Sequence, residues 1–367
     1  MAPFPRARTR AGSPPVPLAE AAERLGTRVD ATFRQAARRF PVRFPRSYLD
    51  LARPGDPDDP VRRIGWPDPE EIRDDPEAIA DPVGEDRLRL HPLLLRKYPD
   101  RALLLVTARC HFYCRFCFRA GAQREPGPGE VEEAIAVLGA APSAAGVREV
   151  ILSGGDPLVL ADARLSEILQ ALAALPRLER IRIHTRAPVH DPDRVTPALV
   201  RTLREASPRP LRVAVHASHP RELTPAFDRA VALLRGAGIP LLNQTVLLRG
   251  VNADARVLAE LFAGLAARGV RPYYLHHPDR VAGAARFRVT IEQGLAIDGE
   301  LRGLLPREEL PAYVLDLPDG SGKVPVASLE RAGPRLWRWR GDGGGESLYE
   351  DIERGSAWRD PGTSSTR

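Results

Sequence analysis

The stretch Arg109-Cys110-His111-Phe112-Tyr113-Cys114-Arg115-Phe116-Cys117-Phe118-Arg119 contains all three cysteines of the 367-residue chain. Three thiols so close together cannot all pair as disulfides, and a structural zinc site normally takes four ligands. A 4Fe–4S cluster held by three thiolates keeps one iron without a protein ligand, free to bind a substrate or cosubstrate. C-x3-C-x2-C therefore indicates a cluster. Zinc with His111 as fourth ligand, and chance clustering of structural cysteines, are the weaker alternatives.

Composition narrows the class of protein. Hydrophobic residues make up 43% of the chain, enough for a sizeable core. No apolar run approaches the roughly twenty residues of a membrane-spanning helix, and the basic N-terminus lacks the apolar segment of a secretory signal. The net charge of +6 would suit nucleic acid, but the arginines are spread among Asp and Glu. We therefore expect a mixed-charge surface, no nucleic-acid or membrane partner, and, from the clustered thiols, a cytoplasmic location.

Composition shifts along the chain predict its organisation. A helical pattern covers 17–40, and Pro- and Asp-rich loops with short helices cover 41–85. The predicted segments are a disordered tail (1–16), a helical and loop extension (17–100), a barrel (101–290), a C-terminal segment (291–340) and a loose tail (341–367).

Apolar strand-like runs alternate with helical patterns from about residue 102. This rhythm predicts an α/β fold with a parallel sheet, and six repeats suit a partial (β/α)6 barrel of the TIM type. Functional residues of such barrels gather at the C-terminal ends of strands. The expected strands are Ala102–Thr107, Glu149–Ser153, Arg180–Thr185, Leu211–Ala217, Leu241–Leu248 and Pro272–His276. The expected helices are Glu130–Leu138, Leu165–Leu175, Pro197–Ala206, Pro220–Gly236 and Ala253–Arg268, followed by a helix over 291–304 and a strand over Leu310–Leu315.

The cysteine motif at the end of a first strand resembles the signature of the radical S-adenosylmethionine (SAM) enzymes. In that superfamily the open iron binds the amino and carboxylate groups of SAM, and reduction of the cluster releases a 5′-deoxyadenosyl radical. Ser153-Gly154-Gly155-Asp156 closes the second expected strand. A lone G-G-D stretch is a weak signal, but at this distance from the cysteines it resembles the superfamily's glycine motif, which receives the SAM amino group.

Further motifs resemble the lysine 2,3-aminomutase family of radical SAM enzymes, from about residue 40 to 330. They are Lys97-Tyr98-Pro99-Asp100-Arg101, His184-Thr185-Arg186-Ala187-Pro188, His216-Ala217-Ser218-His219-Pro220, Asn243-Gln244-Thr245-Val246-Leu247-Leu248-Arg249-Gly250-Val251-Asn252 and Leu315-Asp316-Leu317-Pro318-Asp319-Gly320-Ser321-Gly322-Lys323. In that family the counterpart of Lys323 forms a Schiff base with pyridoxal phosphate (PLP). Without the resemblance, a lone Lys in a Gly-rich turn would be a surface residue.

The resemblance also implies cofactor contacts. Lys97, Tyr98 and Arg101 would bind the PLP phosphate, with Gln244 near it. Lys97 stands where the family has Arg, which keeps the charge but loses bidentate geometry. His216 would line the SAM side of the site.

The resemblance further implies how the substrate is held. Arg119, two residues after Cys117, would bind the lysine carboxylate as a bidentate pair. Asp279 and Asp316 would hold the side-chain ammonium. Two carboxylates in one closed pocket repel each other unless a cation sits between them, so this pair predicts a substrate with a cationic tail.

The activity implied is that of an isomerase that moves the α-amino group of L-lysine from C2 to C3 and yields β-lysine. Its cofactors would be a 4Fe–4S cluster, SAM and PLP. A low-potential electron donor would be a partner, and the family allows a homo-oligomer.

Three rival interpretations remain. The segment from His276 to Phe287 and the Phe44-Pro45-Arg46 stretch look closer to the branch that modifies elongation factor P. That branch lacks the second Asp, so Asp316 favours free lysine. The second rival is an aminomutase for another cationic amino acid, such as arginine. The third is a basic zinc module that binds nucleic acid, which would need a fourth metal ligand.

Overall fold

A curved parallel sheet forms the body of the protein in the computed structural model, which describes residues 12–119, 124–341 and 344–353. Ten strands follow one another in the order β1 to β10. The strands from β3 to β9 are parallel neighbours, whereas β1, β2 and β10 add antiparallel pairs at the two edges. The strands are β1 (Arg89–His91), β2 (Leu94–Tyr98), β3 (Arg101–Thr107), β4 (Glu149–Gly154), β5 (Arg180–Thr185), β6 (Leu211–Val215), β7 (Leu241–Val246), β8 (Val270–His276), β9 (Ala312–Leu317) and β10 (Gly322–Pro325).

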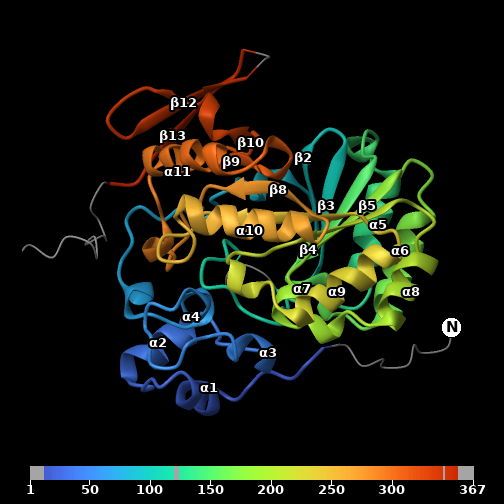
Figure 1. Cartoon of the computed structure of the whole chain (residues 1–367). Helices are drawn as coiled ribbons and strands as arrows, with labels where there is room; N and C mark the ends of the chain where they lie inside the picture. Colours follow the sequence, from blue (N-terminus) through green and yellow to red (C-terminus); the bar gives the residue numbers. More distant parts are fainter. Residues whose placement is uncertain (1–11, 120–123, 342–343, 354–367) are drawn as a thin grey trace, which may run out of the picture.

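Helices join the parallel strands and lie along the outside of the sheet (Figure 1). They are α5 (Glu130–Ala140), α6 (Asp162–Ala173), the short α7 (Ala187–His190), α8 (Pro197–Glu205), α9 (Pro225–Gly236), α10 (Ala255–Ala267) and α11 (Ile291–Leu304). The six expected strands and the helices between them are all present, so the prediction of an α/β partial barrel is confirmed.

The sequence patterns of the elements explain this agreement. Strand β4 is buried along nearly its whole length, as expected for a parallel strand covered on both faces. Gly238 and Gly269 follow α9 and α10 with φ of 72° and 70°, the left-handed conformation that commonly ends a helix. The expected runs 211–217 and 241–248 lose two residues each to the loops after β6 and β7, and the first of these loops contributes His216 to the site.

The sequence predicts one helical segment over residues 17–40, but the N-terminal extension has two helices there. They are α1 (Leu18–Arg24) and α2 (Ala31–Arg39). Gly26 between them has a φ of 60°, and the Asp30 side chain accepts a hydrogen bond from Phe33 N at 2.7 Å, which starts the second helix. The extension continues with α3 (Arg46–Leu49) and α4 (Pro60–Gly65). In Figure 1 it lies beneath α7 and α9.

The expected disorder of residues 1–16 does not extend to residues 12–16, and residues 1–11 lie outside the described part of the chain. Ser13 donates from its backbone N and its Oγ to Asp191, each at 2.7 Å. Val16 is buried and donates from its N to Phe44 O at 2.8 Å. These long-range contacts order a segment whose own composition favours disorder.

The expected loose tail is also corrected in part. β11 (Glu330–Arg331), β12 (Leu336–Arg340) and β13 (Glu346–Glu350) form a separate antiparallel sheet. Tyr349 of β13 is buried, and its ring lies 6.2 Å from that of His277. The Gly-rich stretch therefore connects paired strands. Residues 342–343 and 354–367 lie outside the described residues.

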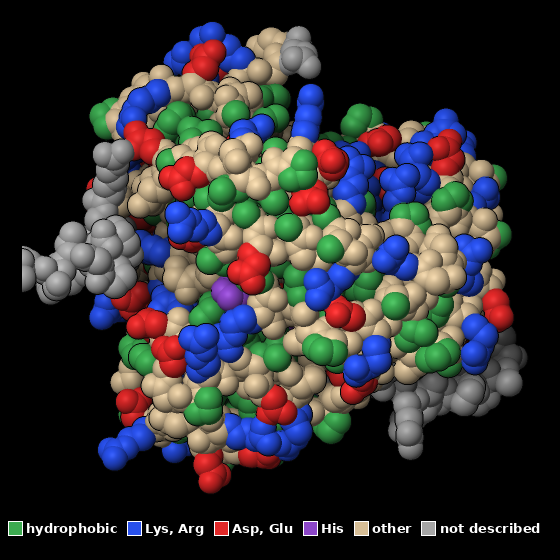
Figure 2. Space-filling model, viewed as in Figure 1, with side chains coloured by type: hydrophobic (Ala, Val, Ile, Leu, Met, Phe, Trp, Pro, Cys, Tyr) green, Lys and Arg blue, Asp and Glu red, His purple; other side chains and the backbone are tan. Residues whose placement is uncertain are grey.

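The surface carries charges of both signs. Figure 2 shows Lys and Arg side chains interspersed with Asp and Glu over the visible face. Among the described residues, no helix has the length and apolar character needed to cross a membrane.

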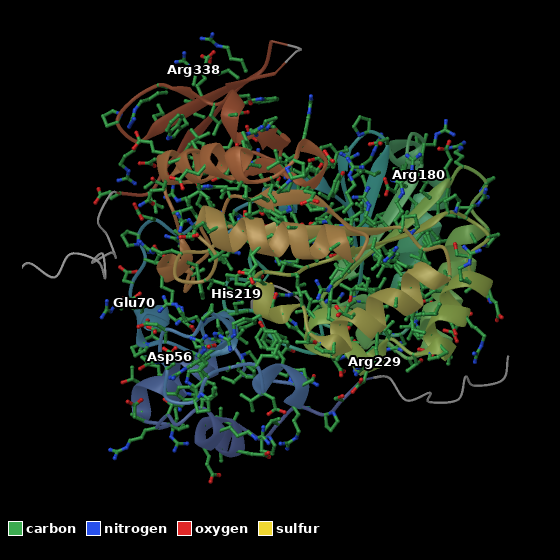
Figure 3. The ribbon with its side chains drawn as sticks, in the orientation of Figure 1. Asp56, Glu70, Arg180, His219, Arg229 and Arg338 are labelled. Carbon is green, nitrogen blue, oxygen red and sulfur yellow. The ribbon has the colours of Figure 1, made fainter. Side chains whose placement is uncertain are left out.

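The extension meets the barrel at the loop after β6. His219, labelled in Figure 3, lies in this loop between the extension and the helices of the barrel. Arg221 of the same loop forms a close ion pair with Asp59, a fully buried carboxylate of the extension. This pair fixes the extension against the loops that surround the site.

Candidate active site

A cavity of about 330 Å³ lies at the C-terminal ends of the parallel strands. All of the predicted site residues line it, although they come from positions 97 to 323. They are Lys97, Tyr98, Arg101, Cys110, Cys114, Cys117, Arg119, Ser153, Gly154, Gly155, Asp156, His216, Gln244, Asp279, Asp316 and Lys323.

The cysteine loop follows β3 and is held by the N-terminal extension. Arg115, in the middle of the motif, forms a buried ion pair with Glu71 and donates to Phe40 O at 2.7 Å. The Phe112 ring packs against Tyr48, with ring centroids 4.7 Å apart. The side chains between the cysteines thus anchor the loop, while the thiols face the cavity.

The three thiols lie in a buried environment. Burial raises the pKa of each thiol, and that of Cys114 reaches about 11. Arg186 Nη1 donates to Cys114 Sγ at 2.8 Å. A cationic donor at this position would stabilise the thiolate form that metals bind.

The zinc alternative would require His111 as the fourth ligand. Among the described residues, no three His, Cys, Asp or Glu side chains are grouped closely enough to hold one. His111 Nδ1 instead lies 3.1 Å from Asp191 Oδ2. This arrangement disfavours the zinc alternative, whereas an iron–sulfur cluster takes its thiolates at separate iron atoms.

Gly154 and Gly155 allow the end of β4 to approach the start of the cysteine loop. A Cβ on Gly154 would lie 2.3 Å from Thr107 O, and one on Gly155 would lie 2.1 Å from Arg109 O. Gly155 N and Asp156 N donate to the same two carbonyls at 2.6 Å and 2.8 Å. Glycine is therefore required here by backbone packing as well as by any ligand.

The Asp156 carboxylate connects three elements. It accepts hydrogen bonds from Leu158 N at 3.0 Å, Thr185 Oγ1 at 2.7 Å and Arg186 N at 2.8 Å. A carboxylate has about four acceptor positions, so one remains for a ligand. Asp156 consequently fixes the ends of β4 and β5 relative to each other beside the thiols.

A row of polar side chains crosses β5, β7 and β8. Gln244 lies 3.1 Å from His184 Nε2 and 3.2 Å from His276 Nε2. Burial lowers the pKa of both histidines, that of His276 to about 3, so both rings are neutral at physiological pH. By contrast, His216 Nε2 and Arg186 Nε are buried and have no hydrogen-bond partner among the described residues. Unpaired buried polar atoms are rare in folded proteins, and here they line a cavity that a ligand can fill.

The other end of the cavity is built by the β9–β10 hairpin. Asp316 and Lys323 are paired across its two strands, and Lys323 Nζ donates to Asp316 Oδ2 at 2.5 Å. Lys97 Nζ also pairs closely with Asp316, and it donates to Val83 O at 2.8 Å. Burial would raise the pKa of Asp316, but the two ammonium groups outweigh it and hold this pKa at about 2.

Asp279 differs from Asp316 in its surroundings. It forms no hydrogen bond or ion pair through its side chain with any described residue. Burial, together with the nearby charge of Asp316, raises the pKa of Asp279 to about 7. Of this pair, Asp316 thus stays charged at neutral pH, whereas Asp279 titrates near it.

Tyr98 and Arg101 lie beside the hairpin. The Tyr98 hydroxyl accepts from Lys323 N at 2.9 Å, and the Arg101 guanidinium lies 4.0 Å from the centre of the Tyr98 ring. Gly322, with a φ of 111°, would bring a Cβ within 3.0 Å of that ring. The Lys97 ammonium points to Asp316 rather than to Tyr98 or Arg101.

Sequence reasoning missed two residues of the site. Arg186 belongs to a family-like motif whose sequence does not indicate its contact with Cys114, and Glu85 belongs to no motif. Arg119 donates from Nε to Glu85 Oε2 at 3.1 Å and from Nη2 to Glu85 Oε1, and its guanidinium lies 4.4 Å from the Phe118 ring centre. Glu85 lies in a Pro- and Asp-rich loop whose sequence carries no signal of this contact.

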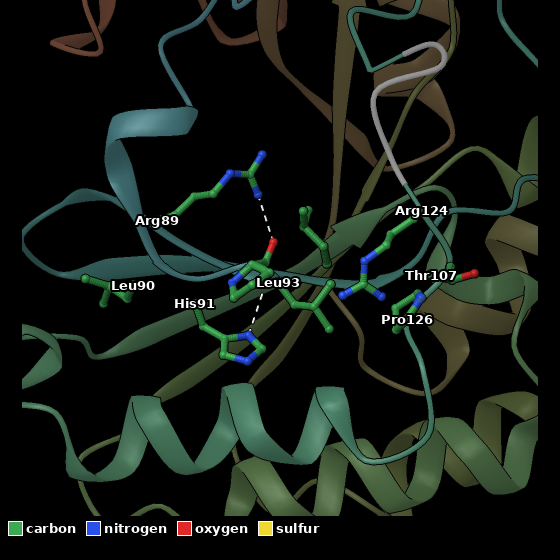
Figure 4. A pocket seen from close by; sticks show the side chains of 9 residues that line it. Arg89, Leu90, His91, Leu93, Thr107, Arg124 and Pro126 are labelled. Atoms are coloured by element: carbon green, nitrogen blue, oxygen red, sulfur yellow. Dashed lines mark hydrogen bonds between the residues drawn. The ribbon is translucent and has the colours of Figure 1, made fainter.

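A second cavity, of about 440 Å³, lies beside the edge strand β1 (Figure 4). Its polar side chains already have protein partners. Arg89 Nη1 donates to Pro92 O at 2.8 Å, His91 Nδ1 accepts from Leu93 N at 3.2 Å, and Arg124 pairs with Glu130 at 2.5 Å. None of the predicted site residues lines it.

Comparisons with known proteins identify the family of the chain. The Radical SAM superfamily model matches residues 104–262. A protein of Clostridium subterminale named L-lysine 2,3-aminomutase is 41% identical over 283 residues, which is 76% of this chain and 67% of that protein. A protein of the same name from Escherichia coli K12 is 38% identical over 296 residues, 80% of this chain and 85% of that protein. Another from Fusobacterium nucleatum is 40% identical over 271 residues, 73% of this chain and 63% of that protein. The chain therefore belongs to the lysine 2,3-aminomutase family of radical SAM enzymes, a family of isomerases whose membership implies a 4Fe–4S cluster, SAM and PLP as cofactors.

Proposed function

We propose that this enzyme moves the α-amino group of L-lysine from C2 to C3 and yields β-lysine, in a reaction that depends on PLP. One observation carries the proposal: the three thiols, Lys323 and the carboxylate pair of Asp279 and Asp316 line the same cavity. A shared cavity would allow the radical source, the amino-group carrier and a cationic substrate to lie within reach of one another.

The thiol end would receive the cluster and SAM. Cys110, Cys114 and Cys117 would hold the cluster. The glycine stretch that ends in Asp156, together with Ser153 and His216, would contact SAM. The unpaired His216 Nε2 supports this assignment, because a bound ligand would give it a partner. When bound, the cluster and SAM supply the radical that starts the reaction.

The hairpin end would receive PLP. Lys323 would hold it, and Tyr98, Arg101, Gln244 and Lys97 would surround its phosphate. Burial lowers the pKa of Lys323, but Asp316 outweighs burial and the net shift is upward. Lys323 would therefore carry a proton in the substrate-free cavity, and an ammonium group that competes for Asp316 would favour its loss. When bound, PLP carries the amino group and spreads the unpaired electron.

Substrate recognition would use a positive charge for the carboxylate of lysine and negative charges for its side-chain ammonium. Arg119 would bind the lysine carboxylate, while Asp279 and Asp316 would bind the side-chain ammonium. Asp279 supports this assignment because its carboxylate is buried beside a second carboxylate and has no partner among the described residues. An ammonium group placed between them would relieve the repulsion and favour loss of the Asp279 proton.

The proposal extends to the partners and setting of the enzyme. A low-potential reductant would supply the electron that the cluster needs, and the reaction would take place in the cytoplasm. The elongation-factor branch and an arginine aminomutase are the rival functions. Asp316 favours free lysine over the first rival, and the length of the arginine side chain, which would displace the reacting carbon, disfavours the second.

The test is an anaerobic assay of the reconstituted holoenzyme. The protein is incubated with SAM, PLP, dithionite and either lysine, arginine or glutamate, and the products are identified by mass spectrometry. We expect β-lysine from lysine, with much slower conversion of arginine and none of glutamate. Better turnover of glutamate would refute the recognition scheme, and SAM cleavage without any β-amino acid would refute the aminomutase function.

A further inference from the structure

Glu85 contacts Arg119, the residue proposed above to bind the substrate carboxylate. The Glu85 carboxylate occupies one edge of the guanidinium, formed by Nε and Nη2, through two hydrogen bonds. Both side chains are largely shielded, with 16% of Glu85 and 14% of Arg119 exposed. A bidentate pair of this kind fixes the plane of a guanidinium as well as its position.

The backbone around Glu85 is itself held in place. The Asp81 carboxylate accepts from Glu85 N at 2.8 Å and from Asp86 N at 2.9 Å. Gly84 has a φ of 66°, and a Cβ there would lie 2.5 Å from Gly320 N in the turn between β9 and β10. The segment that carries Glu85 is thus packed against the hairpin that carries Asp316 and Lys323.

The opposite edge of Arg119 remains open. Nη1 has no hydrogen-bond partner among the described residues, and only one hydrogen of Nη2 is used by Glu85. A guanidinium offers five N–H donors in a rigid fork, so the Nη1–Nη2 edge can still bind a second carboxylate in bidentate fashion. This free edge belongs to a side chain that lines the cavity.

Arg119 is also close enough to Asp279 to lower its pKa, although burial has the larger, opposite effect. Without Glu85, the guanidinium would be free to turn toward this unpaired carboxylate. The two groups would then neutralise each other. A fixed Arg119 keeps the group that would bind the substrate carboxylate apart from Asp279, which would bind the substrate ammonium.

We propose that Glu85 is a positioning residue: it grips the Nε–Nη2 edge of Arg119 and presents the Nη1–Nη2 edge to the carboxylate of the amino-acid substrate. This inference rests on the proposed function, because it takes Arg119 as the carboxylate-binding residue. The alternative is that Glu85 competes with the substrate for Arg119, and the two interpretations predict opposite effects of removing Glu85.

The test compares Glu85→Ala and Glu85→Gln with a matched control, Asp86→Ala. Asp86 is the next residue, and its side chain is 77% exposed and pairs with the surface residue Arg89. Binding of L-lysine and of cadaverine, which is lysine without its carboxylate, is measured by calorimetry on the anaerobic holoenzyme without reductant. The kcat and KM for lysine are then measured with dithionite.

Glu85→Ala should weaken lysine binding by roughly 10- to 100-fold, the scale expected for a misplaced binding group, and should leave cadaverine binding unchanged. Most of the kinetic effect should appear in KM. Glu85→Gln, which keeps one acceptor, should fall between Glu85→Ala and the wild type, and Asp86→Ala should match the wild type.

Tighter lysine binding by Glu85→Ala would overturn the inference and establish competition instead. Equal weakening of lysine and cadaverine binding would also overturn it, because the effect would then be structural rather than specific to the carboxylate. If the wild type binds lysine no better than cadaverine, Arg119 does not bind the substrate carboxylate, and both the inference and the recognition scheme fail. If Glu85→Ala prefers lysine over cadaverine to the same degree as the wild type, only the inference fails.

Discussion

The two ends of the cavity differ in how their polar groups are satisfied. At the thiol end, His216 Nε2 and Arg186 Nε are buried without partners among the described residues. At the hairpin end, Asp316 is already balanced by Lys97 and Lys323. The thiol end is therefore shaped to be completed by a ligand, whereas the hairpin end must exchange ion pairs when a ligand arrives. One cavity thus combines unpaired polar atoms that a ligand can satisfy with ion pairs of Asp316 that a ligand must replace.

The largest expected effect comes from removing a thiol at the thiol end of the cavity. Changing Cys110, Cys114 or Cys117 to Ala should abolish both the absorbance of the iron–sulfur cluster and the reductive cleavage of SAM, because two thiolates hold the cube poorly. Anaerobic spectroscopy and product analysis measure the two losses. Undiminished SAM cleavage by any one of these variants would be incompatible with the assignment.

The next effect concerns the covalent position of PLP at the hairpin end. Lys323→Ala should remove the PLP label that borohydride fixes on the wild-type protein, because Lys323 is the amine proposed to bond the cofactor. Peptide mapping after reduction identifies the labelled residue. Lys97, which shares Asp316 with Lys323, provides the control: a label on Lys97 in the wild type would show that the two lysines have the reverse roles.

The ion-pair exchange can be tested with the two carboxylates. Asp279→Asn and Asp316→Asn should each lower kcat/KM for lysine by roughly a hundredfold or more, because loss of one partner of a buried charge pair costs about 3–5 kcal/mol. Asp316→Asn should have the larger effect, since it also leaves Lys97 and Lys323 without their shared partner. Steady-state kinetics with lysine give both values. Wild-type kinetics in both variants would rule out the two-carboxylate scheme.

The smallest expected effect is a pH dependence at the same end. The pKa of Asp279 is raised to about 7 in the substrate-free cavity, so its carboxylate is neutral below this pH and charged above it. The kcat/KM for lysine should therefore rise with pH through about 7, falling about tenfold per unit on the acid side. Asp279→Asn should remove this limb of the profile. An unchanged limb in the variant would assign the titration to another group.

Local patterns in the sequence predicted the barrel well. Strand β5 lies where its apolar run predicted, and α11 matches the expected helix over 291–304. The errors occurred where long-range contacts override composition. Ser13 is ordered by Asp191, which is 178 positions away, and β13 is ordered by pairing with β12. No local pattern encodes these contacts.

The sequence by itself determined the chemistry that depends on short spacing. The three cysteines are brought together by one loop, and Asp316 meets Lys323 because a hairpin folds the chain back between them. The spacing of the cysteines indicated a cluster before the fold was known. The roles of Asp316 and Lys323 followed from the family resemblance of their segment, and the hairpin gives the physical reason for their proximity.

Only the tertiary structure decided which charges meet. Glu85 reaches Arg119 across 34 positions and Lys97 reaches Asp316 across 219, and neither pair has a signature in sequence. The physical reason is that a charge buried by folding must find a partner in whatever lies beside it. That neighbour is determined by the packing of strands and loops from distant parts of the chain.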